Sequence, residues 1–70
     1  MTGYVYYYDE MGTVRCGHIA GSTRDMLREC KRQTKRGVIV IRLVTYKYLP
    51  KYNASTQVGV HERDEIEAVR

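Results

Sequence analysis

The segment from Ser22 to Gly37 has the pattern of a single amphipathic helix. Ser22 can cap the first turn, Asp25 follows three residues later, and Gly37 is a natural stop. At about 100° per residue, one stripe of this helix collects small and apolar side chains. That stripe consists of Thr23, Met26, Leu27, Cys30 and Thr34. A helix with one apolar stripe must pack against a second layer, which the rest of the chain has to supply.

The segments on either side of this helix favour β-structure. Residues 3–8 and 13–20 predict a hairpin with a four-residue loop, and residues 38–48 predict a long central strand that ends at Leu49-Pro50. Residues 56–61 predict a weaker strand. Residues 62–70 fit either a short helix through Ile66 and Val69 or a strand, and we favour the strand.

These elements predict an α+β fold of two layers. One antiparallel sheet of three to five strands, in the order β-β-α-β-(β), carries the single amphipathic helix on one face. The chain of 70 residues is expected to form one domain over residues 1–70. A domain of this size buries only roughly 60% of its unfolded surface, which argues against a deep catalytic cleft. The second face of the sheet is expected to stay uncovered.

The expected hairpin register places Tyr8 opposite Thr13. Because cross-strand partners share a face, this register sorts the side chains of both strands. The face against the helix is expected to hold Val5, Tyr7, Val14, Cys16 and His18. The open face is expected to hold Tyr4, Tyr6, Tyr8 and Arg15.

Simple alternation sorts the long strand in the same way. Ile39, Ile41 and Leu43 are expected to pack on the helix. The open face is expected to receive Val40, Arg42, Val44 and Tyr46. The resulting surface of tyrosine and arginine contains the residue types that are enriched at protein interfaces, and the same types stack on single-stranded bases.

The positive charge of the chain is concentrated in the helix. The whole chain has a formal net charge of +4, with 12 Lys and Arg against 8 Asp and Glu. Residues 22–36 account for all of it, because the remaining basic and acidic residues cancel. The face opposite the apolar stripe carries Arg24, Arg28, Lys31 and Lys35, with Arg32 and Arg36 at its edge. Such a stripe can contact phosphates or an acidic protein surface, or be a solvated outer face.

Neither catalysis nor metal binding has a clear motif in this chain. Cys16 and His18 are two residues apart on one strand, and we expect them and Cys30 to be buried structural residues. A zinc site would need these residues together with His61, but no Cys-x-x-Cys or His-x-x-x-His pair is present. We therefore expect no enzyme activity, no catalytic residue, no metal and no cofactor.

Composition also bears on the compartment. No apolar run approaches the length of a membrane span, and the first residues lack the features of a secretory signal. We expect a cytoplasmic protein with reduced cysteines and no membrane partner.

The hairpin over 3–20, the helix over 22–36 and the strand over 38–48 together resemble small phage-encoded inhibitors of the type I anti-CRISPR kind. The resemblance rests on layout, size and charge. It implies a non-enzymatic protein in the host cytoplasm that docks on a nucleoprotein complex and blocks its binding of nucleic acid. The positive stripe departs from inhibitors that imitate DNA with acidic surfaces.

Two functions follow from the residues and the resemblance. The first is an interaction or inhibitor protein whose partner is a host protein or nucleoprotein complex. The alternative is direct binding of nucleic acid. Both would use Arg24, Arg28, Lys31, Arg32 and Lys35 on the helix, with Tyr4, Tyr6, Tyr8, Arg15 and Arg42 on the sheet. A homodimer through the open sheet face is a further expected association.

Overall fold

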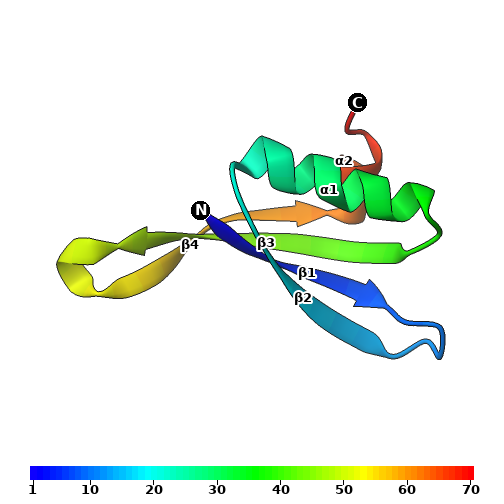
Figure 1. The fold of residues 1–70 in the computed structure, drawn as a ribbon, viewed down its shortest axis with the longest axis horizontal. Helices are drawn as coiled ribbons and strands as arrows, with labels where there is room; N and C mark the ends of the chain where they lie inside the picture. Colours follow the sequence, from blue (N-terminus) through cyan, green and yellow to red (C-terminus); the bar gives the residue numbers. More distant parts are fainter.

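The computed structural model describes residues 1–70 and confirms the α+β architecture. In chain order the elements are β1 (Thr2–Tyr8), β2 (Val14–Ala20), α1 (Thr23–Lys35), β3 (Ile39–Leu49), the 3-10 helix η1 (Pro50–Tyr52), β4 (Ala54–Glu62) and α2 (Arg63–Glu67). The four strands form one antiparallel sheet in the spatial order β2-β1-β3-β4. α1 therefore connects β2 to β3 across the intervening β1, and both helices lie on the same side of the sheet (Figure 1).

α1 begins and ends where its sequence predicts. The Ser22 Oγ accepts a hydrogen bond of 3.1 Å from the backbone N–H of Asp25, which satisfies one of the free donors of the first turn. At the other end Arg36 is the C-cap, and Gly37 follows with a φ of 95°, a conformation that favours glycine. Met26 and Cys30 of the apolar stripe are each 1% exposed.

The core lies between α1, α2 and the centre of the sheet. It contains Val5, Met26, Cys30, Val40, Leu43 and Ile66. Gly3 lets the helix approach this closely, because a Cβ at Gly3 would lie 2.9 Å from the Met26 Sδ and 3.0 Å from the Leu43 Cδ1. The absence of a side chain at Gly3 thus allows Met26 to rest on the backbone of β1.

The β1–β2 hairpin is paired one residue away from the expected register. Tyr8 lies opposite Val14 instead of Thr13, because Thr13 closes the turn. The Asp9 Oδ1 accepts from the backbone N–H groups of Met11 and Thr13, both at 2.9 Å, and the Asp9 N–H donates to the Thr13 carbonyl at 2.9 Å. A shift of one residue moves every side chain of a strand to the other face.

The shift corrects the assignment of faces on β2. Val14, Cys16 and His18 were expected against the helix, but they pair with Tyr8, Tyr6 and Tyr4 and lie on the open face. Arg15 was expected on the open face and instead lies opposite Tyr7, on the helix side. Cys16 and His18 are exposed, so the expectation that they are buried is wrong, whereas Cys30 is buried as expected.

A bulge corrects the assignment on β3. Tyr6 pairs with Arg42 but Tyr7 pairs with Val40, so Ile41 has no partner on β1 and the alternation breaks there. Val40 therefore faces the helix and Ile39 faces the open side, opposite to the expectation for both. The placement of Leu43 against the helix and of Arg42, Val44 and Tyr46 on the open face is correct.

The end of the chain is the short helix α2, so the strand favoured over residues 62–70 is wrong. Glu62 shares a face with Arg42 on the open side, and a strand continuing from it would put Ile66 on that side too. The helix instead turns Ile66 into the core, where it is 0% exposed. Asp64 and Glu65 lie in the first turn of α2, where the helix dipole favours acidic residues.

We predict that the fold depends on the packing of α2. Ile66→Ala should lower the free energy of unfolding by about 2–5 kcal/mol, since it leaves a cavity in the core. Met11→Ala truncates a side chain that is 90% exposed in the hairpin loop and should cost much less. Urea unfolding measures both variants, and Ile66→Val serves if Ile66→Ala does not fold. Equal losses at the two positions would mean that α2 is not packed.

We also predict a pH-dependent contribution from the hairpin turn. The Arg15 side chain, 2.9 Å away, and the N–H groups of the turn hold the pKa of Asp9 below its ordinary value of 3.8. A lowered pKa in the folded state stabilises the fold at higher pH, and this contribution is lost as the pH falls below 3.8 and through the lowered pKa. Asp9→Asn should therefore be less stable than the wild type at pH 7, with the difference shrinking in acid. Glu10→Gln is the control, and a difference for Asp9→Asn that is constant with pH would contradict the prediction.

Candidate functional site

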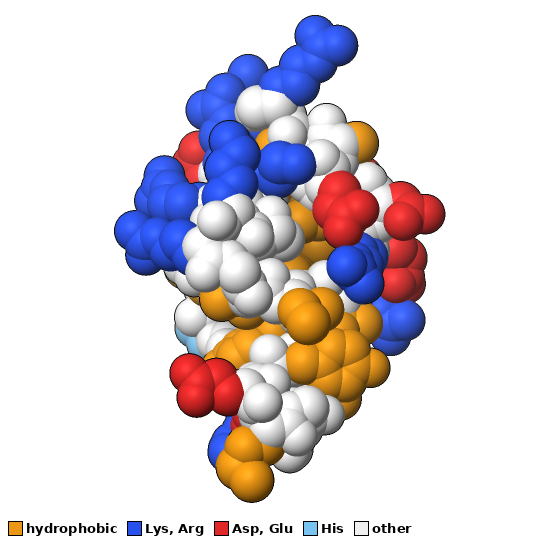
Figure 2. All heavy atoms as spheres, turned by 90° about the vertical axis from the view of Figure 1, so that its right-hand side faces the viewer, with side chains coloured by type: hydrophobic (Ala, Val, Ile, Leu, Met, Phe, Trp, Pro, Cys, Tyr) orange, Lys and Arg blue, Asp and Glu red, His pale blue; other side chains and the backbone are white.

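Two surfaces of different chemistry lie on opposite sides of the molecule. α1 packs its apolar stripe on one face of the sheet, so its basic side chains point away from the sheet. The open face of the sheet lies on the other side and carries most of the tyrosines. Figure 2 shows Lys and Arg side chains gathered in the upper part of the view, where α1 and the C-terminus lie, with hydrophobic side chains below.

The five basic residues expected on α1 border a groove that the C-terminus completes. One depression, of about 190 Å³, is lined by Arg28, Lys31, Arg32, Lys35, Val69 and Arg70. An adjoining depression, of about 460 Å³, is lined by Thr23, Arg24, Leu27, Arg28, Val69 and Arg70. The two share Arg28, Val69 and Arg70, and we call them together the basic groove.

α2 creates the basic groove by turning the chain back beside α1. Ile66 anchors α2 in the core, and the Lys31 Nζ donates a hydrogen bond to the Glu67 carbonyl. The backbone N–H of Val69 then bonds to the Ile66 carbonyl at 3.2 Å, so the chain stays close to α1 as it ends. These contacts bring Arg70 to the basic residues of α1.

Most cations of the basic groove have no anionic partner. Arg32 forms an ion pair of 2.8 Å with Glu29. Lys31 donates to the Glu67 carbonyl. The remaining four cations, Arg24, Arg28, Lys35 and Arg70, form no ion pair with a carboxylate. Like charges at helical spacing repel one another, and a bound anion would relieve this repulsion. The groove thus combines a concave shape with uncompensated positive charge.

Arg70 was missed in the sequence. The strand favoured for residues 62–70 did not place Arg70 beside α1. The spacing of three residues between Ile66 and Val69 was the signal for this placement, because it fits a helical turn that brings the following residues back beside α1.

The open face is richer in apolar and aromatic side chains than expected. In addition to Tyr4, Tyr6 and Tyr8, the observed register adds Val14, Cys16 and His18 from β2 and Val60 from β4. Tyr4 lies at the centre, with its ring edge-on to His18 at 5.3 Å and to Tyr46 at 5.7 Å between ring centroids. The adjacent Cys16 and partial desolvation raise the pKa of Tyr6, so its phenol stays protonated.

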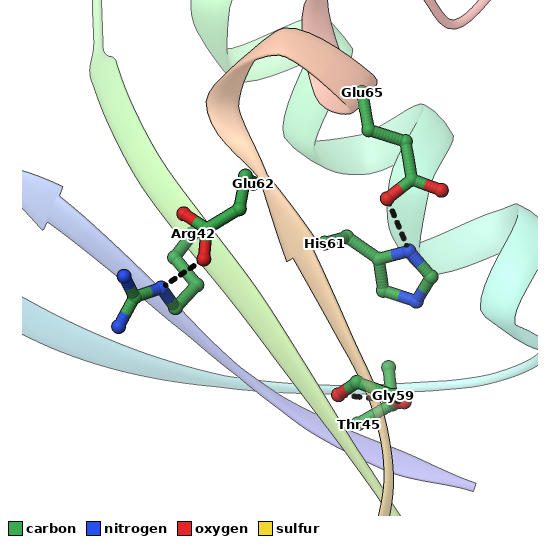
Figure 3. A network of polar contacts seen from close by, with 6 residues as sticks. All are labelled: Arg42, Thr45, Gly59, His61, Glu62 and Glu65. Atoms are coloured by element: carbon green, nitrogen blue, oxygen red, sulfur yellow. Dashed lines mark hydrogen bonds and ion pairs between the residues drawn. The ribbon is translucent and has the colours of Figure 1, made fainter.

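The two arginines expected on the sheet are both ion-paired. Arg42 does lie on the open face, where its Nε is 3.0 Å from the Glu62 Oε1 (Figure 3). Arg15, on the helix side, pairs with Asp9 at 2.9 Å. Figure 3 also shows His61 directed away from the Arg42 pair, with its Nδ1 2.8 Å from the Glu65 Oε2. The charge of Arg42 is therefore compensated, and the sheet face is neutral.

A second basic region lies in the arm formed by the ends of β3 and β4, which extends beyond α1 (Figure 1). Lys47, Tyr48, Lys51 and Tyr52 are all exposed there. The Lys51 Nζ lies 5.7 Å from the centre of the Tyr52 ring, and the Tyr48 hydroxyl donates to the Asn53 Oδ1 at 2.6 Å. The signal for this region was the absence of Asp and Glu between residues 30 and 61.

The residues considered for catalysis or metal binding are not brought together. Cys16 and His18 lie on the open face, Cys30 lies in the core, and His61 faces α2. No group of three or more His, Cys, Asp or Glu side chains is arranged to hold a metal ion. None of the helices has the length and hydrophobicity to cross a membrane.

We predict that the two thiols differ sharply in reactivity. Burial, with a smaller effect of Glu29, raises the pKa of Cys30 to about 11, so its thiol stays protonated and shielded. In dilute solution at neutral pH, an aromatic disulfide reagent should titrate one thiol per native chain rapidly and the second only after denaturation. Cys16→Ser should abolish the rapid reaction and Cys30→Ala should leave it unchanged. Two thiols reacting at one rate would contradict the burial of Cys30.

Comparison with known proteins does not extend this description. The chain matches no protein-family model, no curated protein and no solved structure. The function therefore has to be argued from the two surfaces themselves.

Proposed function

We propose that this chain is a non-enzymatic protein that binds the phosphate backbone of nucleic acid through the basic groove. The observation that carries the proposal is the set of four cations without carboxylate partners, Arg24, Arg28, Lys35 and Arg70, along adjoining depressions. Neutralising phosphates with Lys and Arg releases condensed counterions, which is the main source of affinity in such contacts.

The shape of the groove favours a polymer over a small anion. Arg24, Arg28, Lys31 and Lys35 follow one another along the helix. At about 1.5 Å per residue, they cover roughly 16 Å of the helix axis. Each strand of a duplex carries one charge per roughly 3.4 Å of its axis, so a row of cations can meet several successive phosphates. A single small anion would occupy only one part of this row.

This binding mode does not require a particular sequence. Contacts to phosphates position a protein on nucleic acid, while contacts to base edges select the sequence. The basic groove is shallow and cationic, and its apolar lining is limited to Leu27 and Val69. We therefore propose binding with little sequence preference and a strong dependence on salt.

The expectation of docking on a nucleoprotein complex would use the same surface. It differs in one respect, since the chain would then need the protein component of the complex. We favour direct binding because an anionic polymer alone can neutralise the uncompensated charge of the groove. No protein component is needed for this. Binding assays with purified nucleic acid distinguish direct binding from docking on a nucleoprotein complex.

Charge removal tests the proposal. Arg28→Gln/Lys35→Gln should weaken binding of a labelled mixed-sequence DNA duplex and of single-stranded RNA, measured by fluorescence anisotropy. Each lost phosphate contact lowers the slope of log affinity against log salt by about 1, so the double variant should lower it by about 2. Neither side chain is buried, so the fold should be retained.

The matched control is Met11→Glu/Thr13→Glu, which changes the net charge by the same amount in the hairpin loop, no residue of which lines the basic groove. It should keep the wild-type slope. Absence of binding to either nucleic acid at low salt would overturn the proposal, as would equal loss of affinity in both double variants. Retention of a protein partner after nuclease treatment, without binding of purified nucleic acid, would favour docking on a complex instead.

A further inference from the structure

We propose that the open face of the sheet joins two copies of this chain in a symmetric dimer. The face consists of the side chains that the strand register places on the same side of the sheet as Tyr4, Tyr6 and Tyr8. It lies away from the basic groove, so the dimer does not depend on the binding of nucleic acid.

The open face of the sheet is hydrophobic. The chain exposes ten large hydrophobic side chains, and six of them, Tyr4, Tyr8, Val14, Ile39, Tyr48 and Val60, lie here with exposed fractions of 39–54%. Large contiguous apolar surfaces on soluble proteins mark sites of association. No element of this chain covers the face, because α1 and α2 both lie on the other side (Figure 1).

The charge of the open face favours a second copy of this chain as the partner. Arg42 and Glu62 are the only Lys, Arg, Asp or Glu residues on the face, and they neutralise each other at 3.0 Å. A nucleic acid would meet the Glu62 carboxylate and no free cation. In a symmetric dimer the same patch meets itself, so Arg42 of one copy can pair with Glu62 of the other. The charge of the face is thus complementary to that of a second copy, and a strongly charged partner would find no matching charge there.

The area of the open face can be compared with the area that a stable dimer needs. The strands have 7 to 11 residues, and spacings of about 4.8 Å between strands and 3.3 Å along them give a projected area of roughly 500 Å². The accessible area is larger, because the aromatic rings stand up from the sheet. A standard interface takes about 800 Å² from each partner, so a dimer of this kind would have to use the whole face.

Sedimentation equilibrium or light scattering tests the dimer. Interfaces of this size have dissociation constants of about 1 µM or lower. At about 100 µM the wild type should therefore have about twice the monomer mass of 8.2 kDa. Tyr4→Lys and, separately, Val60→Lys should each raise the dissociation constant of the dimer at least tenfold, since each variant would bury an unpaired ammonium in the interface. Met11→Lys adds the same charge to a side chain that is 90% exposed in the hairpin loop and should remain a dimer.

The thiol of Cys16 gives a second readout that does not depend on mass. Its alkylation should slow as the concentration of the wild type rises, and this slowing should be absent in Val60→Lys, whose fold is checked by circular dichroism. A wild type that is monomeric at about 100 µM would overturn the proposal. So would a dimer whose dissociation constant is unchanged in both lysine variants. Because nucleic-acid binding is measured separately, loss of one proposal leaves the other standing.

Discussion

The contact of α1 with the bare backbone of Gly3 is the constraint on which the other features depend. Met26 fits against β1 only because Gly3 has no side chain, and this contact sets the distance between the two layers. It also fixes the rotation of α1, which directs Arg28 and Lys35 away from the sheet. Ile66 completes the same core from α2 and thereby brings Arg70 beside them. The basic groove is therefore a product of core packing.

The sequence predicted those features that depend on contacts between residues close together in the chain. It failed where contacts between distant segments decide the structure. α1 was predicted correctly because its cap at Ser22 and its stop at Gly37 act within a few residues. The hairpin register failed because Asp9 accepts two N–H bonds and moves Thr13 into the turn, a choice that periodicity does not reveal. The β3 bulge at Ile41 arises from pairing with β1 and has no local signal.

The candidate site was predicted in part for the same reason. The basic residues of α1 lie where helical spacing places them, and Tyr4 stands on the open face as strand alternation requires. The error at Arg15 followed directly from the register. Arg70 depended on α2, whose helical form is decided by where Ile66 must be buried and not by its own five residues. Short segments with weak propensity take the conformation that tertiary packing selects.

The arm formed by the ends of β3 and β4 gives the molecule two levels of stability. From Lys47 to Gln57 the ribbon has only two strands, no helix above it and almost no buried side chain. An isolated two-stranded ribbon is marginally stable in water, so its hydrogen bonds can open without unfolding the core. Amide hydrogens in the arm will exchange with solvent through local fraying, whereas those of Leu43 and Val44 will exchange only through global unfolding. Lys47, Tyr48 and Lys51 thus belong to a segment that can change its shape while the rest of the sheet keeps its own.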